Sequence, residues 1–374
     1  MKFVVNSATL LKQLSAINGV IVSNPIVPIL ENFLFQIKDG LLTITASDLQ
    51  TSITAELRVD ADQDGGIAVP AKMLIETLRN LPEQPVTFKI DFEAFSVEII
   101  SEKGRYKLAG EDATDFPQVP QLKQAQTVEL SSENVLDAIA YTLFAVSTDE
   151  MRPAMNGVYL DLRQESAIFV STDSHRLMRY ERQDVKPSLE TALIIPRKAL
   201  MLLKNSLPTD STPLTLSFTK SNAVFTFSNI SMACRLIDER FPDYQNVIPT
   251  NNPNSLLIDR LEFIGCLKRM AIYANKTTNQ VKLKLTENAI QVSAEDIDFS
   301  NEADETLNCE YTGEDMEIGF NARFLIEGLS NLSAKHVNMK FSEPNRAVIV
   351  TPEEKDNAED ILMLIMPVML NNYY

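Results

Sequence analysis

One pattern of segments occurs three times along the 374 residues of this chain, at intervals of about 125 residues. The clearest copies are VPAKMLIETLRNLP (69–82), IPRKALMLLKNSLP (195–208) and FNARFLIEGLSNLS (320–333). Apolar residues recur in each copy at helical spacing, as Leu74, Leu78 and Leu81 do in the first. A unit that recurs at constant spacing indicates three tandem copies of one fold.

Other segments recur in the same order. A second helical segment opens each unit with Ser or Asp, which suits a helix N-cap; its copies are 7–18, 132–146 and 259–274. Alternating runs with an acidic turn recur at 41–54, 167–180 and 289–302, and hairpin patterns recur at 86–100, 214–227 and 337–350. We therefore expect an α+β fold of three units, at 1–122, 123–250 and 251–374. The alternative is ordinary α+β periodicity that only resembles repetition.

Composition and cysteine usage limit the class of protein. Hydrophobic residues make up 45% of the chain, which is typical of a folded protein. The longest apolar run, 361–370, contains Pro367 and is too short to span a bilayer, and the N-terminus has no signal-peptide pattern. Three cysteines, Cys234, Cys266 and Cys309, are far apart and have no nearby His. We expect reduced thiols and a cytoplasmic location.

The charge is unevenly distributed along the sequence. A formal net charge of −17 argues, as a bulk quantity, against a nucleic-acid partner. The six expected helical segments nevertheless hold 12 Lys and Arg against six Asp and Glu, so they carry +6 and the rest carries −23; they are 7–18, 70–81, 131–146, 196–206, 259–276 and 320–336. Helices that share one face would make that face suitable for a polyanion. Alternatively, these bases serve only solubility.

Five motifs together resemble one family. VPAK–LRNLP, STDSHRL, RLIDERFPDY, GEDMEIGFN and LIMPVML occur here in the order in which the bacterial β sliding clamp, the beta subunit of DNA polymerase III, carries them. The resemblance implies three clamp domains per chain and a head-to-tail homodimer closed into a ring. Such a ring encircles double-stranded DNA without reading its sequence, and it tethers the polymerase alpha subunit. It also implies an ATP-driven clamp loader as a partner, no membrane contact, no cofactor and no catalysis.

The resemblance also implies a hydrophobic site for short peptides of partner proteins. Its residues here are Met155, Thr172, Ser174, His175, Arg176, Leu177, Pro242, Val247, Phe324, Ala347, Leu364, Met366, Pro367 and Val368. Met and Leu side chains suit varied apolar anchors. The chain departs from the family at Ser174, where Gly is common, and at Asn246, where a base often lies. A tail of sequence NNYY follows.

Two further surfaces follow from the same resemblance. The dimer interface would use Lys103, Arg105, Tyr106, Lys107 and Leu108 against Ile272, Tyr273, Glu302 and Asp304, and opposite charges would fix its direction. Alternatively, Tyr106 and Leu108 pack within their own sheet. DNA contacts would come from Lys72, Arg79, Arg152, Arg197, Lys198, Lys204, Lys268 and Arg269. Asn24 and Asp149 stand where the family often has Arg and Gln.

Other functions remain as rival hypotheses. His175 and Asp173, with Ser171 or Ser174, could form a catalytic group, but one local cluster does not place three groups in space. Glu314, Asp315 and Glu317 could suggest a divalent metal, yet they lack the spacing of a calcium loop. The rivals to the sliding clamp are a protein-binding adaptor that never encircles DNA, and a carboxylate-dependent nuclease.

Overall fold

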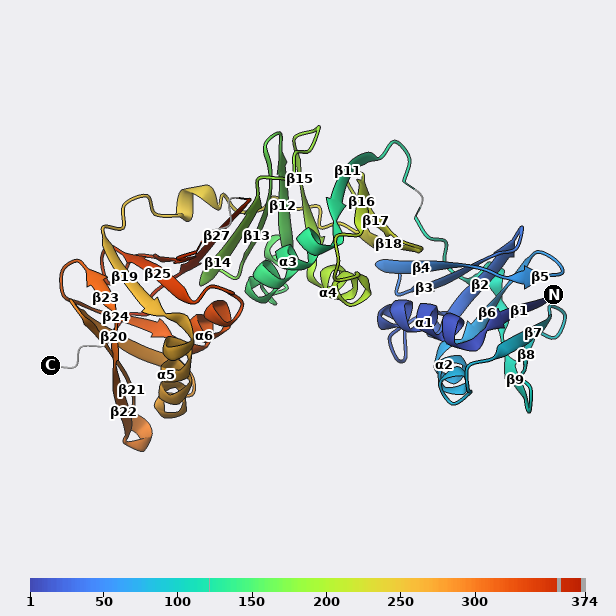
Figure 1. Ribbon diagram of the computed structural model, residues 1–374, viewed down its shortest axis with the longest axis horizontal. Coiled ribbons are helices and arrows are strands. Elements are labelled where there is room, and N and C mark those ends of the chain that lie inside the picture. Colours follow the sequence, from blue (N-terminus) through green and yellow to red (C-terminus); the bar gives the residue numbers. More distant parts are fainter. Residues whose placement is uncertain (121, 355–357, 371–374) are drawn as a thin grey trace. The chain divides into compact units, whose positions relative to one another are not determined.

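The computed structural model describes residues 1–120, 122–354 and 358–370, so the NNYY tail at 371–374 lies outside the described residues (Figure 1). Contacts divide the chain into two compact units. Unit 1 comprises Met1–Leu136 and Lys198–Leu236, and unit 2 comprises Asp137–Arg197 and Ile237–Tyr374. Each unit thus combines one terminal third of the sequence with part of the middle third, because strands of the middle third extend the sheets of both neighbours.

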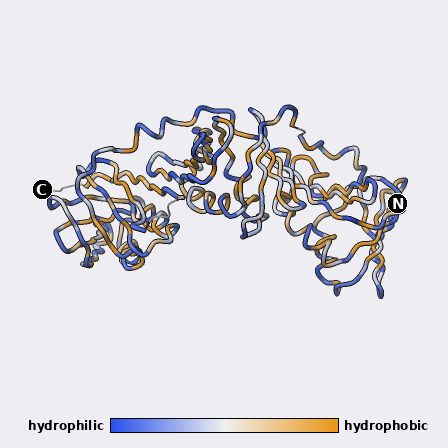
Figure 2. Tube along the Cα trace, turned by 45° about the horizontal axis from the view of Figure 1, so that its top comes forward, coloured by the Kyte–Doolittle hydropathy of each residue, from blue (hydrophilic) through white to orange (hydrophobic). Residues whose placement is uncertain are grey.

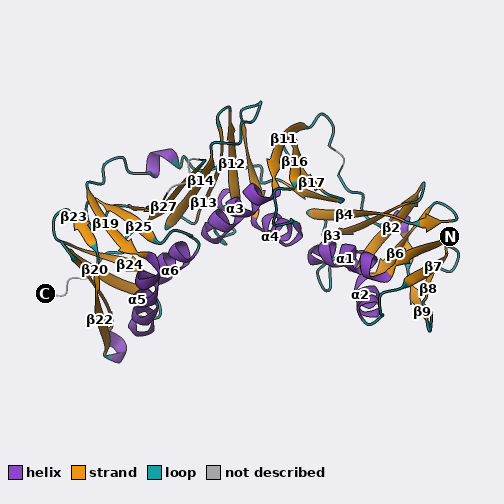
Figure 3. Cartoon of the chain, in the orientation of Figure 1, coloured by secondary structure: helices purple, strands orange, loops and turns teal. Residues whose placement is uncertain are grey.

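Unit 1 contains two antiparallel sheets and two of its helices pack together. The five-stranded sheet has the order β5-β1-β7-β8-β9 and the nine-stranded sheet β10-β6-β2-β3-β4-β18-β17-β16-β11. Helix α1 packs on α2 and against β3 and β4 (Figure 3). The elements are β1 Lys2–Asn6, α1 Ser7–Ile17, β2 Asn32–Lys38, β3 Leu41–Ser47, β4 Thr51–Arg58, β5 Asp60–Ala61, β6 Gly65–Pro70, α2 Ala71–Arg79, β7 Pro85–Asp91, β8 Ser96–Ile100, β9 Arg105–Ala109, β10 Glu111–Asp112, β11 Gln126–Ser131, β16 Pro213–Phe218, β17 Asn222–Phe227 and β18 Ile230–Arg235.

Unit 2 repeats this architecture. Its sheets have the orders β15-β12-β13-β14-β27-β26-β25-β19-β23 and β22-β21-β20-β24, and α5 packs on α6 and on β20, β21 and β22. Helices α3 (Ser132–Thr142) and α4 (Arg197–Ser206) each begin in one unit and continue in the other. The remaining elements are β12 Gly157–Arg163, β13 Ser166–Thr172, β14 Arg176–Arg182, β15 Thr191–Pro196, β19 Asn254–Asp259, α5 Arg260–Tyr273, β20 Gln280–Thr286, β21 Ala289–Asp296, β22 Asn301–Asn308, β23 Glu310–Thr312, β24 Met316–Asn321, α6 Ala322–Ser330, β25 His336–Phe341, β26 Val348–Pro352 and β27 Glu359–Ile365.

The core forms where alternating strands turn their apolar faces toward the helices. Hydrophobic residues recur along the strands of both units in Figure 2. In unit 1, Phe3 and Phe88 face each other across the β1–β7 pair, and their rings stack with centroids 4.7 Å apart. Both side chains are fully buried, together with Leu10 and Leu14 of α1. The buried face of the strands, formed by every second residue, thus packs in one layer against the buried face of the helix, where residues recur every 3.6 positions.

The repeated strand patterns are confirmed as hairpins. The runs with an acidic turn form the pairs β3–β4, β13–β14 and β21–β22, and the hairpin patterns form β7–β8, β16–β17 and β25–β26. All of these pairs are antiparallel.

The expected helix ends need correction. The sixth helix ends at Ser330, not at 336, because Asn331 caps it by donating its side-chain amide to the Glu327 carbonyl at 2.8 Å. The Arg260 guanidinium then holds the following loop by donating to the Ala334 carbonyl at 2.6 Å. The fifth helix ends at Tyr273. Lys276 therefore lies beyond the fifth helix, and Lys335 lies beyond the sixth. The six α-helices as observed hold ten bases and five acids, and their net charge of +5 preserves the predicted asymmetry.

Asp259 provides a local test of why α5 begins where it does. Its carboxylate accepts from the Glu262 amide at 2.9 Å, and this bond lowers the pKa of Asp259 below its ordinary value of 3.8. We expect Asp259→Ala to lower the free energy of unfolding by about 1 kcal/mol at pH 7. Because the folded pKa is the lower one, this contribution is present above pH 3.8 and disappears as the pH falls through the folded pKa. Denaturant unfolding at pH 7 and pH 3 measures the difference, and Asp259→Asn, which keeps the cap, is the control.

Candidate functional sites

The turn between β13 and β14 is built by its own side chains. The Asp173 carboxylate accepts from the amides of His175 and Arg176, both at 3.0 Å, and the Thr172 hydroxyl donates to the Arg176 carbonyl at 2.7 Å. Ser174 has a φ of 77°, the left-handed region that Gly adopts most easily. The turn therefore buries Thr172 and Arg176 and leaves Ser174 and His175 exposed.

Arg176 lies beneath this turn as a buried cation. Its guanidinium pairs with Asp173 at 3.0 Å and with Glu327 of α6 at 2.7 Å, and it donates to the Phe144 carbonyl at 2.8 Å. The same group lies over the rings of Phe144 and Phe324, 5.1 and 4.8 Å from their centroids. With only 7% of its side chain exposed, Arg176 connects the turn to α6 and supports the site from below.

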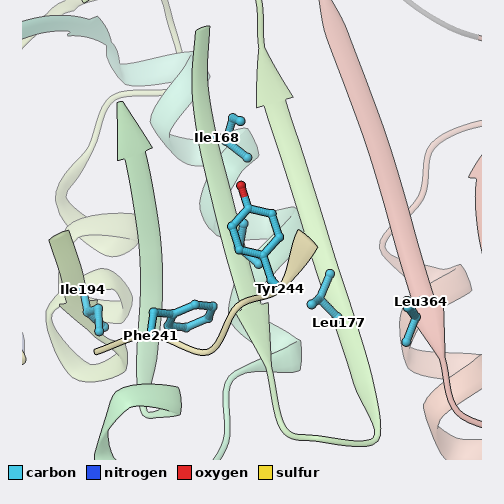
Figure 4. Packing of buried hydrophobic residues seen from close by; sticks show 7 residues of the cluster. Ile168, Leu177, Ile194, Phe241, Tyr244 and Leu364 are labelled. Atoms are coloured by element: carbon cyan, nitrogen blue, oxygen red, sulfur yellow. The ribbon is translucent and has the colours of Figure 1, made fainter. Parts of the chain in front are cut away.

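An apolar cluster forms the floor beside the turn. Leu177 and Leu364 face each other across the β14–β27 pair, and both are buried. Phe241 and Tyr244 come from the segment that follows β18, and both side chains pack into the same cluster as these leucines (Figure 4). Ile168, Val170 and Ile194 complete the buried cluster, and Ala347 packs against it. Phe241 and Tyr244 were not predicted, although the RLIDERFPDY motif that contains them was recognised.

Exposed apolar side chains surround this floor. Val247 is 56% exposed and Met366 40%, while Met155, Pro242, Pro367 and Val368 are half-buried. The Met366 amide donates to the His175 carbonyl at 2.8 Å, which fixes the chain after β27 beside the turn. The His175 ring stacks on Phe324 with centroids 5.8 Å apart. The fourteen predicted peptide-site residues thus all belong to unit 2, and the contacts above bring the turn, the cluster and the chain after β27 together.

Seven of the eight predicted DNA-contact residues lie on helices, and Arg152 lies in the loop before β12. Lys72 and Arg79 are exposed on α2, Lys198 and Lys204 on α4, and Lys268 and Arg269 on α5, whereas Arg197 is half-buried. Three of the predicted cations have partners within the chain. Lys198 pairs with Asp48, Arg269 with Glu305 at 2.6 Å, and Arg152 with Asp149 at 3.3 Å and with the Ser174 hydroxyl. These three charges are therefore partly compensated before any ligand arrives.

The predicted dimer residues lie on or next to two edge strands of opposite charge and at the end of α5. Strand β9 ends the five-stranded sheet and exposes Arg105, Tyr106 and Lys107, while Lys103 precedes it in the β8–β9 turn. Leu108 is buried within its own sheet, with 4% exposure, so Tyr106 supplies the apolar surface of this edge. Strand β22 ends the four-stranded sheet and exposes Glu302 and Asp304. Ile272 and Tyr273, at the end of α5, are 65% and 42% exposed.

The residues of the catalytic hypothesis have structural partners. The buried Ser171 hydroxyl donates to the Thr142 carbonyl at 2.6 Å, and the Asp173 carboxylate is held by Arg176 and the turn amides. Among residues 1–120, 122–354 and 358–370, no group of three or more His, Cys, Asp and Glu could hold a metal ion. Burial raises the pKa of the Cys234 and Cys266 thiols to about 12 and that of Cys309 to about 11. No helix in the described ranges is long and apolar enough to cross a membrane.

Comparison with protein families covers nearly the whole chain. Models of the DNA polymerase III beta subunit match as its N-terminal domain at residues 1–120, its central domain at 129–243 and its C-terminal domain at 245–368. This chain belongs to the DNA polymerase III beta subunit family. Membership confirms the three tandem clamp domains and the sliding-clamp function that the repeats and motifs predicted.

Curated relatives and solved structures agree with the family models. The beta sliding clamp of Vibrio cholerae is 27% identical over 99% of this chain and 100% of its own length, and that of Synechococcus elongatus is 29% identical over the full length of both. The crystal structure of the DNA polymerase III beta subunit of Pseudomonas aeruginosa has a TM-score of 0.94 at 25% identity, covering 99% of this chain and 100% of that one. A sliding clamp of Bartonella birtlesii, bound to griselimycin, scores 0.91 at 27% identity over the same shares.

Proposed function

We propose that this chain works as a head-to-tail homodimer that closes around double-stranded DNA and tethers the DNA polymerase III alpha subunit without making or breaking a bond. The match of three clamp domains along one chain carries the proposal. The domain boundaries are 122 and 250, and the protein acts in the cytoplasm, where its three thiols stay reduced.

The two charged edge strands support ring closure. An unpaired edge is a template for pairing with another chain, and β9 and β22 present bases and acids respectively. Pairing β9 of one chain with β22 of the next is heterologous, and only a closed arrangement prevents fibres. Six domains with two helices each would then place twelve helices, about 8–10 Å apart, around a hole of about 25 Å.

The helices support the choice of DNA as the encircled polymer. They are basic within an acidic chain, so a lining of helices would attract phosphates without base contacts. A clamp that stays on the DNA also keeps the tethered polymerase near the primer end, so the effective concentration of the polymerase there rises.

The proposed function is tested by primer extension with the cognate polymerase and clamp loader on primed single-stranded DNA. The clamp should lengthen the products of a single binding event; products of unchanged length would contradict the proposed function.

The apolar floor and its exposed rim support peptide docking in unit 2. We propose that the polymerase, the clamp loader and other partners insert short apolar segments over Leu177 and Leu364, against Met366 and Val247. Both floor residues are buried, while the rim residues remain accessible to a ligand. A few buried anchors carry most of the binding energy in such sites.

Met366 tests the peptide site with little risk to folding, because its side chain is already 40% exposed. We expect Met366→Ala to weaken binding of a synthetic peptide from the cognate polymerase about tenfold, as loss of one anchor contact does. Fluorescence anisotropy measures the affinity. Met369→Ala, three residues further on and 76% exposed, is the matched control and should bind like wild type. Equal affinities for both variants would place the peptide elsewhere.

A further inference from the structure

The backbone of the peptide-site turn occurs a second time, in unit 1. Between β3 and β4, the Asp48 carboxylate accepts from the amides of Gln50 and Thr51 at 2.9 and 2.6 Å, as Asp173 does in unit 2. The left-handed residue recurs as well, since Leu49 has a φ of 75° where Ser174 has 77°. The two turns therefore share their hydrogen bonds and their conformation.

The neighbouring strand recurs in the same register. Cys234 pairs with Thr51 across β4–β18, where Ile365 pairs with Arg176 across β14–β27. The amide of Arg235 donates to the Gln50 carbonyl at 2.9 Å, as the amide of Met366 donates to the turn in unit 2. The frame of the proposed peptide site is thus present twice in each chain.

The side chains on this second frame differ in size and polarity. Ser52 and Ala233 occupy the paired positions that Leu177 and Leu364 occupy in unit 2. The smaller side chains leave a cavity of about 340 Å³, which also takes in Pro120, Ser221 and Asn222. That volume lies within the range of small-ligand sites.

Two side chains at this cavity could contact a ligand: the cation of Arg235 and the apolar side chain of Leu49. The Arg235 side chain is exposed, and its guanidinium makes no hydrogen bond or ion pair with any residue that the structure describes. Leu49 exposes 53% of its apolar side chain. Its backbone is left-handed, a conformation that is unfavourable for a residue with a Cβ. An uncompensated cation beside an exposed apolar side chain complements a carboxylate next to an apolar group.

We propose that this cavity in unit 1 is a second peptide site, which binds a short extended segment carrying an Asp or Glu next to an apolar residue. The carboxylate pairs with Arg235, the apolar side chain covers Leu49, and the peptide backbone meets the polar groups of Gln50 and Asn222. Arg235 stands where the unit 2 site has Met366, so the two sites select different partners. The inference rests on the proposed function, because its model is the peptide site in unit 2.

The test uses the full-length protein and N-acetyl-leucyl-aspartate amide as the probe, titrated by saturation-transfer NMR. Wild type and Met366→Ala should bind the probe equally, whereas Arg235→Gln should bind it about tenfold more weakly, since a charge-assisted bond is lost. The uncharged leucyl-asparagine probe should bind wild type as weakly as the aspartate probe binds Arg235→Gln. Ser52→Leu, which fills the cavity, should also weaken binding.

Two results would overturn the inference. One is an absence of saturable binding to wild type; the other is binding that Met366→Ala removes and Arg235→Gln retains, which would place the probe in unit 2. Polymerase-peptide affinity, measured on the same variants, reports separately on the proposed function. Arg235→Gln should leave that affinity unchanged and Met366→Ala should reduce it, whatever the fate of the probe.

Discussion

Replacing Ile272 by Lys should convert the proposed dimer into monomers, with a rise of about 100-fold or more in the dimer dissociation constant. Ile272 is 65% exposed at the end of α5, so the change removes no core contact. In the proposed interface its side chain lies opposite the edge strand that carries Arg105 and Lys107. The substitution therefore buries a cation among cations, which costs both desolvation and repulsion.

Sedimentation velocity across a concentration series measures this effect. Leu261→Lys is the matched control, because Leu261 lies on the same helix with 66% exposure and outside the proposed interface. It should remain dimeric with wild-type affinity. A wild-type chain that sediments as a monomer at micromolar concentration, or an Ile272→Lys variant that stays dimeric, would refute the proposed interface.

Replacing Arg176 by Ala should lower the free energy of unfolding by about 3 kcal/mol, the range for removing one partner of a buried ion pair. Asp173 and the Phe144 carbonyl would lose a buried donor, and the rings of Phe144 and Phe324 would lose the cation over them. The Glu327 pair adds less, since that carboxylate is 49% exposed and screened by solvent.

Urea unfolding at fixed protein concentration, monitored by the circular dichroism of the tyrosines, measures this change in the free energy of unfolding. The control is Lys186→Ala, which breaks an exposed pair with Glu165 in the same unit and should cost at most about 1 kcal/mol. Similar midpoints for both variants would show that Arg176 is not a structural support. Because Arg176 also fixes the turn, we expect the polymerase peptide to bind its variant more weakly than wild type.

Local pattern was enough to predict two helices and two strand pairs in each copy. Constant spacing located the helices and hairpins of all three copies, and a resemblance carried by motifs led to the family. The predicted end of α6 was wrong because Asn331 already caps the helix after Ser330. The loop that follows is held by Arg260, a residue some seventy positions earlier, which donates to the Ala334 carbonyl. A contact of that kind leaves no signal in the helical pattern itself.

The site was predicted less completely, since burial depends on strand pairing. Arg176 was expected in the peptide site, but its side chain is almost fully enclosed by α6 and the Phe144 carbonyl. Leu108 is buried against the core of its own unit, whereas Lys107 and Ala109 on either side of it in β9 are exposed. The second frame around Asp48 was visible as a repeated acidic turn, yet the cavity depends on the small side chains of Ser52 and Ala233, which only the register places together.

The central claim is that the ring holds DNA by enclosing it. The most direct measurement loads the clamp on nicked circular DNA with its clamp loader, removes free protein by gel filtration, and then cuts the circle with a restriction enzyme. Clamp should remain on the intact circle and leave the linear DNA over its free ends. Retention on linear DNA with unblocked ends would contradict topological binding and with it the proposed mechanism.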